Sequence, residues 1–321
     1  MIRPGKLLLV LTLAAAITGC GGHKAKSSSS STTVAPATSQ AAAGATIDGA
    51  LAVAEVTSAR VELYSIDPST RGLKIAAVAQ VGSGGTFSLS APSAQGPALL
   101  VVRGGSYRDL ASGQRVAFGD PAADPTSLDD PRERVLEVVL AEAAGAHTLN
   151  PSALTTIASR RALTLLADDA DALEAKQVEQ LHLDLAQELG LVVSGQAVDP
   201  RGLAPIAFVD TSNAAAIQAR PFAPEASLGA ILAGISQEAI RLGMTDPRQL
   251  VDLLAADFSD GAFDGAAPSA KAGECEELRL GAAPFDPSAG TQGLADSVAA
   301  FMDQNPRNAS GEPAATFAPL L

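Results

Sequence analysis

The sequence predicts an α+β protein of two domains, an N-terminal antiparallel β-sandwich followed by a small α-helical bundle. Two observations support this. Between residues 46 and 146, short segments of alternating or continuous apolar residues recur between turn clusters, as is typical of an all-β sandwich. From residue 147 onward, the apolar spacing lengthens to that of amphipathic helices. The two predicted domains therefore cover residues 46–146 and 147–321.

Residues 1–19 have the features of a secretory signal peptide. Arg3 and Lys6 precede an apolar run from Leu7 to Ile17 that contains no charged residue, and small residues follow it. The run is shorter than the roughly 20 residues that a membrane-spanning helix needs. We therefore expect this segment to direct export and then to be removed.

The end of the apolar run, Ile17-Thr18-Gly19-Cys20, resembles the lipobox of bacterial lipoproteins. That pattern is an aliphatic residue, a small or hydroxyl residue, Gly or Ala, and Cys, and each position matches. The resemblance implies cleavage before Cys20 and attachment of acyl chains such as palmitate, several of which anchor a protein stably. Gly21 follows in place of Asp, which by the same resemblance implies the outer membrane in a Gram-negative host. The alternative is an ordinary secretory signal in which Cys20 is incidental.

Residues 20–45 are predicted to form a disordered, lipid-anchored tether. A serine run covers residues 27–31, and Thr, Ala, Pro and Gln dominate the residues after it. Such a composition buries too little apolar surface to offset the chain entropy that is lost on folding. The tether would hold the folded part of the cell-envelope protein away from the membrane.

The charge of the chain argues against nucleic acid as a partner. Its 22 Lys and Arg oppose 35 Asp and Glu, which gives a formal net charge of -13. Phosphate backbones repel such a chain. The second of the two cysteines, Cys275, stands among glutamates that disfavour its thiolate, so a structural or incidental thiol is expected there. An intermolecular disulfide is the alternative.

The β-domain is predicted from alternation and from two apolar runs. Alternation indicates strands near residues 60–63, 73–80, 87–90 and 116–118, and the continuous runs 99–102 and 135–140 indicate two more. Glycine-rich clusters such as residues 82–85 and 104–106 mark the turns between them.

The order of these features resembles the carboxypeptidase regulatory-like domain, a small prealbumin-like β-sandwich. The matching residues are Ile47 and Gly49, the segment Ala59-Arg60-Val61-Glu62-Leu63-Tyr64, and Gly85-Thr86-Phe87-Ser88-Leu89. An acidic residue normally precedes the Gly-x-Phe step, and Gly82-Ser83 stands there instead. The resemblance implies an accessory, binding or structural module that contributes no catalytic residue.

One turn of this domain admits two interpretations. The segment from Gly104 to Gly113 contains Tyr107 and Asp109 directly after the strongest apolar strand. These two side chains could contact a ligand. The preferred interpretation is a glycine-rich turn in which Tyr107 is the packing anchor.

The helical domain is predicted to begin at Asn150-Pro151, because Asn caps helices and Pro is favoured at their first position. Further helices are expected after residues 168–171, over 225–242, from Asp246-Pro247, and over about 292–304. Residues 151–158 resemble the Pro-x-x-Leu-Thr-Thr-Ile-Ala step that joins a β-domain to a helical domain in bacterial lipoproteins. Four or five such helices indicate a small bundle.

The segment 257–265 is the one candidate ion site. Asp257, Asp260 and Asp264, together with two glycines, could surround a calcium ion with oxygen ligands. The spacing departs from an EF-hand, since Lys271 stands where the bidentate glutamate belongs. The alternative is a helix end followed by Asx turns.

No catalytic motif is present. The sequence lacks Gly-x-Ser-x-Gly, His-Glu-x-x-His, a phosphate-binding loop and Cys-x-x-Cys, and it contains three histidines, among which His182 is expected to be a surface or hydrogen-bonded residue. We predict a non-enzymatic envelope lipoprotein that serves in binding, adhesion or envelope structure, with no cofactor other than the candidate calcium. The alternatives are a hydrolase with its site at the domain interface and a calcium-stabilised surface module.

Overall fold

The computed structural model describes residues 44–51, 53–119, 136–166, 173–268 and 275–320. The signal peptide, the lipobox, residues 20–43 of the tether, Asp168–Asp171 and Lys271 lie outside these ranges. Within them, six α-helices accompany several antiparallel sheets, which confirms the α+β class. None of the helices in these ranges is both long and apolar enough to span a membrane.

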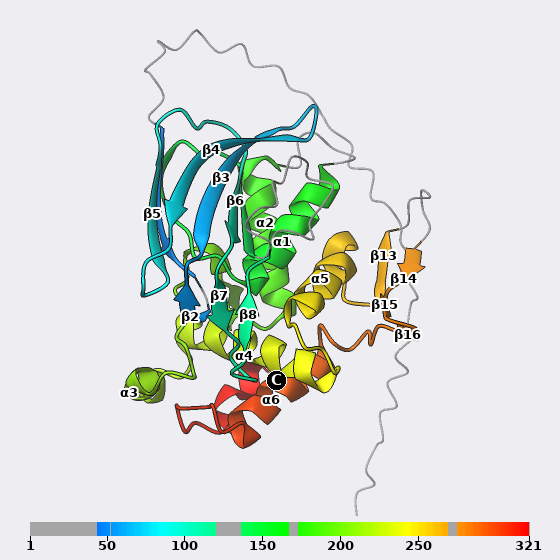
Figure 1. Ribbon diagram of the computed structural model, residues 1–321. Coiled ribbons are helices and arrows are strands. Elements are labelled where there is room, and N and C mark those ends of the chain that lie inside the picture. The colour runs from blue at the N-terminus through cyan, green and yellow to red at the C-terminus, as the bar shows by residue number, and fades with distance from the viewer. Residues whose placement is uncertain (1–43, 52, 120–135, 167–172, 269–274, 321) are drawn as a thin grey trace, which may run out of the picture.

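The first ten strands alternate with short turns and build three sheets (Figure 1). One sheet has the order β10-β1-β5, the second β4-β3-β6-β9 and the third β2-β7-β8. All of their pairings are antiparallel except β1 with β10. The strands are β1 (Ala45–Ala50), β2 (Ala54–Thr57), β3 (Arg60–Asp67), β4 (Gly72–Gln80), β5 (Thr86–Ala91), β6 (Ala98–Arg103), β7 (Ser106–Arg108), β8 (Arg115–Ala117), β9 (Leu136–Leu140) and β10 (Gly145–Thr148).

The first two sheets share one apolar core. On β5, buried Phe87 and Leu89 alternate with exposed serines, as the sequence indicates. These two side chains belong to the same buried cluster as Leu63 of β3 and Leu100 of β6. Alternation therefore predicted correctly which side of β5 faces the interior.

The second face of the four-stranded sheet is covered by helices α1 (Ala153–Leu165) and α2 (Ala175–Glu188) (Figure 1). Leu99 and Val139 of this face pack with Leu163 of α1 and Val178 of α2. Every residue of β6 and β9 is consequently buried. This explains why these two strands are continuous apolar runs in the sequence, because a strand that is covered on both faces needs no polar side.

The four remaining helices are α3 (Ala214–Ala219), α4 (Pro224–Arg241), α5 (Arg248–Asp257) and α6 (Gln292–Gln304). Of these, α5 packs against α1, and α4 packs against α5 and α6. Helix α4 is buried along most of its length and lies against α6, where a Cβ added at Gly234 would stand 2.3 Å from Val298 Cγ2. Gly229 of the same helix instead faces the backbone carbonyl of Ile206. Helices α4 and α6 thus approach each other closely at Gly234.

Short elements connect these helices. The bounds of α6 match the prediction, and α4 and α5 agree with it within two residues. Helix α3 was not among the predicted helices. Six Ala-rich residues are too few to show a helical period. The short elements are β11 (Val192–Val193), β12 (Gln196–Ala197), η3 (Pro200–Gly202), η4 (Thr211–Asn213), η5 (Phe258–Asp260), β13 (Ala266–Pro268), β14 (Cys275–Glu277), β15 (Arg279–Leu280), β16 (Ala283–Pro284) and η6 (Ala314–Leu320).

The start of α1 corrects one prediction. Ser152, not Asn150, is the N-cap: its Oγ accepts from the Thr155 backbone N–H, and Thr155 Oγ1 accepts from the Ser152 N–H, which forms a capping box. Asn150 Oδ1 instead accepts a 2.8 Å hydrogen bond from the Ala50 N–H at the end of β1. The two threonines at this helix start bond to backbone, since Thr155 Oγ1 and Thr156 Oγ1 both donate to the Ser152 carbonyl.

Candidate functional site

A pocket of about 60 Å³ lies where the β-strands meet α4 and α5. Four polar side chains line it: Tyr107, Asp109, Ser236 and Arg248. The rest of the lining is apolar and comes from both the strand and the helix segments: Val53, Leu110, Phe118, Leu136, Ala153, Leu232, Ile235, Pro247 and Val251. Clefts that combine an apolar lining with a few fixed polar groups are the usual form of small-molecule sites.

Tyr107 is directed into this pocket by strand alternation on β7, where its two neighbours are half-exposed. Its ring centroid lies 4.7 Å from that of Phe118. Burial, with a smaller contribution from Asp109, raises the pKa of the Tyr107 hydroxyl above its ordinary value, so the group stays protonated. Tyr107 is therefore a packing residue, as preferred from the sequence, and it also lines the pocket.

Asp109 links the β7–β8 turn to α4. Its Oδ2 accepts from the backbone N–H and the Oγ of Ser112, at 2.8 and 2.6 Å. Its Oδ1 accepts from Ser236 Oγ at 2.5 Å, and that hydroxyl in turn accepts from the Ala111 N–H at 2.8 Å. The side chains of Asp109 and Ser236 are both almost fully buried. These contacts make Asp109 a connector between strands and helices rather than an available acid or base.

Arg248 places a positive charge at the pocket wall, and Asp246 largely neutralises this charge. Arg248 Nε donates to Asp246 Oδ1 and Oδ2 at 2.8 and 2.6 Å, and a third contact joins the same pair. These hydrogen bonds raise the pKa of Arg248. A ligand in this pocket would thus meet apolar surface and a paired charge.

The two histidines in the described ranges lie outside this pocket. His147 Nε2 contacts the backbone carbonyl of Ala143 at 2.9 Å, and His182 Nδ1 contacts that of Val178 at 2.8 Å. His182 is fully buried in α2, which corrects the surface alternative for this residue, and its Nε2 has no hydrogen-bond partner in the described part of the chain. Burial lowers the pKa of His182 to about 4, and the Arg201 guanidinium acts in the same direction.

We expect acid to destabilise the fold through His182. In the unfolded chain this histidine binds a proton below about pH 6.5, whereas in the folded protein it does so only below about pH 4. The contribution of His182 to stability is complete above pH 6.5 and falls as pH decreases toward 4, by up to about 1.4 kcal/mol per unit. Urea unfolding at several pH values measures this slope. It should flatten in His182→Leu but not in His147→Leu; equal slopes in all three proteins would contradict the expectation.

The candidate calcium ligands do not converge in the structure. Asp257 is buried, and its Oδ1 accepts from the backbone N–H groups of Asp264 and Gly265 at 3.0 and 2.8 Å. Burial raises the pKa of Asp257 to about 6 despite these hydrogen bonds. Within the described residues, no group of three or more carboxylate, histidine or cysteine side chains is arranged to hold a metal ion.

The other two carboxylates of this segment close local turns. Asp260 Oδ1 accepts from the Ala262 N–H, and Asp264 Oδ1 accepts from the Ala266 N–H, both at 3.1 Å. This is the Asx-turn geometry that was weighed as the alternative to calcium.

Sequence reasoning missed a buried charge network on the helix-facing side of the four-stranded sheet. Glu62 of β3 is 2% exposed, and its carboxylate binds Arg103 Nε at 2.6 Å, Arg60 Nε at 2.5 Å and the Tyr64 hydroxyl at 2.5 Å. Glu62 was predicted only as a polar residue in an alternating strand. The continuous apolar run on β6 could have indicated that Glu62 is buried. A strand that is apolar on both faces is covered on both faces, and so is the neighbouring strand β3.

A second buried carboxylate extends this network toward the helices. Glu137 of β9 is separated from Glu62 by Val101 in the sheet register and is fully buried. Arg160 of α1 contacts Glu137 Oε1 at 3.3 Å and also pairs with Asp252 of α5. The charges therefore connect the sheet with two helices.

Cys275 is exposed on β14 and is disulfide-bonded.

Comparison with known proteins yielded no matching family model, no matching curated protein and no matching solved structure.

Proposed function

We propose that the protein is a non-enzymatic binding module, anchored in the cell envelope through a lipid on Cys20, that takes an apolar group into the pocket between its strands and helices. The observation that supports binding is this pocket of about 60 Å³ with its largely apolar lining, which suits a small apolar group. In this proposal the two facing sheets are the β-sandwich of a carboxypeptidase regulatory-like accessory domain, and the anchor lies in the outer membrane.

The polar groups of the pocket favour binding over hydrolysis. Ser236 directs its hydroxyl hydrogen at Asp109, whose two carboxylate oxygens already accept three hydrogen bonds. A serine nucleophile requires a base that removes its proton and is itself oriented by a third group. His147 and His182 do not line the pocket, so neither is placed to serve Ser236 as that base.

A bulky substitution at the pocket should weaken the binding of an apolar probe. Val53 is half-buried and lines the pocket, so Val53→Phe places a ring in the binding volume. We expect the affinity for an apolar fluorescent dye to fall about tenfold, which corresponds to roughly 1.4 kcal/mol. The matched control is Val78→Phe on β4, where the native valine is 50% exposed. Identical dye titrations for the two variants would remove the support for the pocket as a binding site.

The proposed anchor can be tested on the full chain expressed in a Gram-negative host. We expect the wild type and Cys275→Ser to fractionate with the outer membrane and to carry acyl mass, and Cys20→Ser to be released. A thioether at the Cys20 sulfur and a disulfide from that same sulfur exclude each other. An unacylated wild-type protein in which Cys20 is joined to Cys275 would therefore overturn the anchor and leave the pocket proposal intact.

A further inference from the structure

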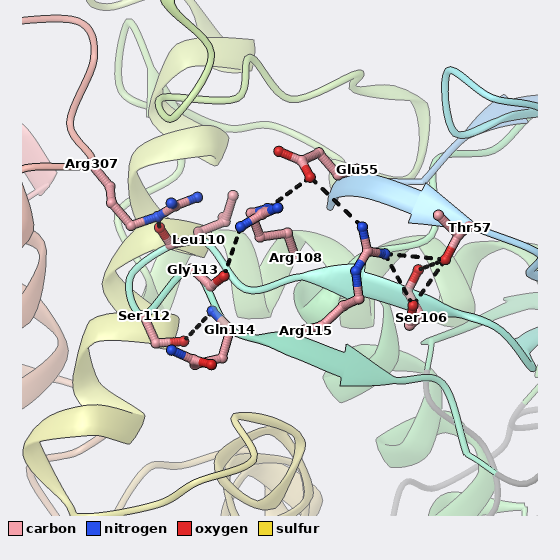
Figure 2. Close-up of polar contacts among 10 residues, drawn as sticks. All are labelled: Glu55, Thr57, Ser106, Arg108, Leu110, Ser112, Gly113, Gln114, Arg115 and Arg307. Atoms are coloured by element: carbon pink, nitrogen blue, oxygen red, sulfur yellow. Dashed lines mark hydrogen bonds and ion pairs between the residues drawn. The ribbon is translucent and has the colours of Figure 1, made fainter.

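The outer face of the β2-β7-β8 sheet gathers three arginines around one carboxylate (Figure 2). Because side chains alternate across a strand, Tyr107 and Val116 point into the core, while Arg108 and Arg115 project from the opposite face. The third arginine, Arg307, follows α6 and reaches the β7–β8 turn, where its Nε donates to the Leu110 carbonyl at 2.9 Å.

Arg108 and Arg115 stand directly opposite each other in the antiparallel pair of β7 and β8. Like charges at such a position destabilise a sheet. Glu55 of β2 compensates them in part, with Oε2 at 2.7 Å from Arg108 Nε and 4.0 Å from Arg115 NH2. Glu55 lies in a β-bulge. Its backbone φ is +46°, a left-handed conformation that is uncommon for glutamate. The backbone is thus distorted at the residue that carries the one compensating carboxylate.

Arg307 adds a further charge beside these two. Gly113 lies between Arg108 and Arg307: its carbonyl accepts from Arg108 NH1 at 3.2 Å, and a Cβ at this position would stand 2.6 Å from Arg307 NH1. Among the described residues, no carboxylate forms an ion pair with Arg307. Three guanidinium groups and one carboxylate leave this face with two positive charges, on a chain whose formal net charge is -13.

Two hydroxyl groups complete the set of polar groups. Thr57 Oγ1 and Ser106 Oγ lie 2.9 Å apart, and each accepts from Arg115 NH1 at 3.2 Å (Figure 2). Guanidinium and hydroxyl donors in combination are the groups that proteins use to bind phosphate oxygens. The side chains of Arg108 and Arg115 are 37% and 50% exposed, so an anion in solution can reach them.

We propose that this face is a binding site for a phosphoryl oxyanion. Arg108 and Arg115 are its principal contacts, the hydroxyls of Thr57 and Ser106 are additional donors, and the Glu55 carboxylate is an internal anion that the ligand replaces. The phosphoryl group is either free phosphate or the headgroup of an anionic phospholipid. This site is on the opposite face of the sheet from the apolar pocket, so the proposal is independent of that function.

The test measures phosphoryl binding in two arms, with the full chain carrying Cys20→Ser so that no acyl chain contributes. One arm titrates inorganic phosphate. The other measures cosedimentation with phosphatidylcholine vesicles that contain or lack phosphatidylglycerol. Saturable phosphate binding identifies free phosphate as the ligand, and binding to the anionic vesicles alone identifies the headgroup; either supports the site.

Matched variants assign the binding to this face. We expect Arg115→Gln to weaken it about tenfold through loss of a charged hydrogen bond, and Glu55→Gln to strengthen it. Arg279→Gln and Glu277→Gln are the controls, because they alter an exposed arginine–glutamate pair on β14 and β15 by the same charges. Binding in neither arm, or equal effects of Arg115→Gln and Arg279→Gln, would overturn the proposal. Thermal midpoints verify that the variants remain folded.

Discussion

Glu62→Gln is expected to lower the free energy of unfolding by about 3–5 kcal/mol, because it removes one partner of a buried ion network. The Glu62 carboxylate binds two arginines and a tyrosine hydroxyl, and the Arg103 side chain is 3% exposed. Arg103 and Arg60 stand opposite each other in the register of β3 and β6. Loss of the carboxylate would leave two facing guanidinium groups, one of them buried. Chemical denaturation of the purified protein measures the change.

The control for this experiment is Glu277→Gln. Glu277 pairs with Arg279 at 3.1 Å, and both side chains are more than half exposed. Exposed pairs contribute little, so we expect a change of less than about 1 kcal/mol. In the double variant Glu62→Leu/Arg103→Met, apolar groups replace both charges, which should cost less than Glu62→Gln alone. A small effect of Glu62→Gln would contradict the view that this network is desolvated.

Gly49→Ala is expected to destabilise the protein by about 3 kcal/mol or more, at the upper end of overpacking substitutions. A Cβ at this position would lie 1.8 Å from the Leu149 carbonyl oxygen and 2.8 Å from Phe87 Cζ. The nearest obstacle is backbone, and Leu149 is fixed by a 2.9 Å hydrogen bond from its N–H to the Asp48 carbonyl. A thermal melt of the variant should show a clearly lower midpoint.

Gly84→Ala is the matched control, because its added Cβ would meet nothing within 4 Å and its φ is ordinary. We expect its stability to stay within about 0.5 kcal/mol of the wild type, as for most surface substitutions. Equal midpoints for Gly49→Ala and Gly84→Ala would show that β1 can shift away from Leu149 without cost.

The sequence predicted the fold where the local pattern and the burial agree. The alternation of Phe87 and Leu89, the strand at residues 99–102 and the helix over residues 292–304 are all present. Predictions failed where a distant partner decides the local role. Asn150 is a residue type that is common at helix N-caps, but its side chain bonds to β1. Glu62 occupies a polar position in an alternating strand, but it is buried.

The candidate sites were harder to predict, because both depend on elements that are distant in the sequence. The pocket joins Tyr107 on β7 to Ser236 on α4, and the arginine face joins β7 to the segment after α6. Tyr107 and Asp109 could be identified from the sequence because they lie in a glycine-rich turn. The sequence had no signal for Arg307, an isolated residue in a C-terminal loop.

The four-stranded sheet packs against strands on one face and against helices on the other, and this affects how the chain folds and unfolds. Leu99, Val139 and Glu137 face the helices, so the strands without the helices would expose apolar side chains, and Glu137 would lose its Arg160 partner. Strand β10 crosses the boundary placed after residue 146, and Leu149 of the following segment bonds to β1. Because unfolding of either half would uncover the other, we expect the two halves to unfold as one cooperative unit.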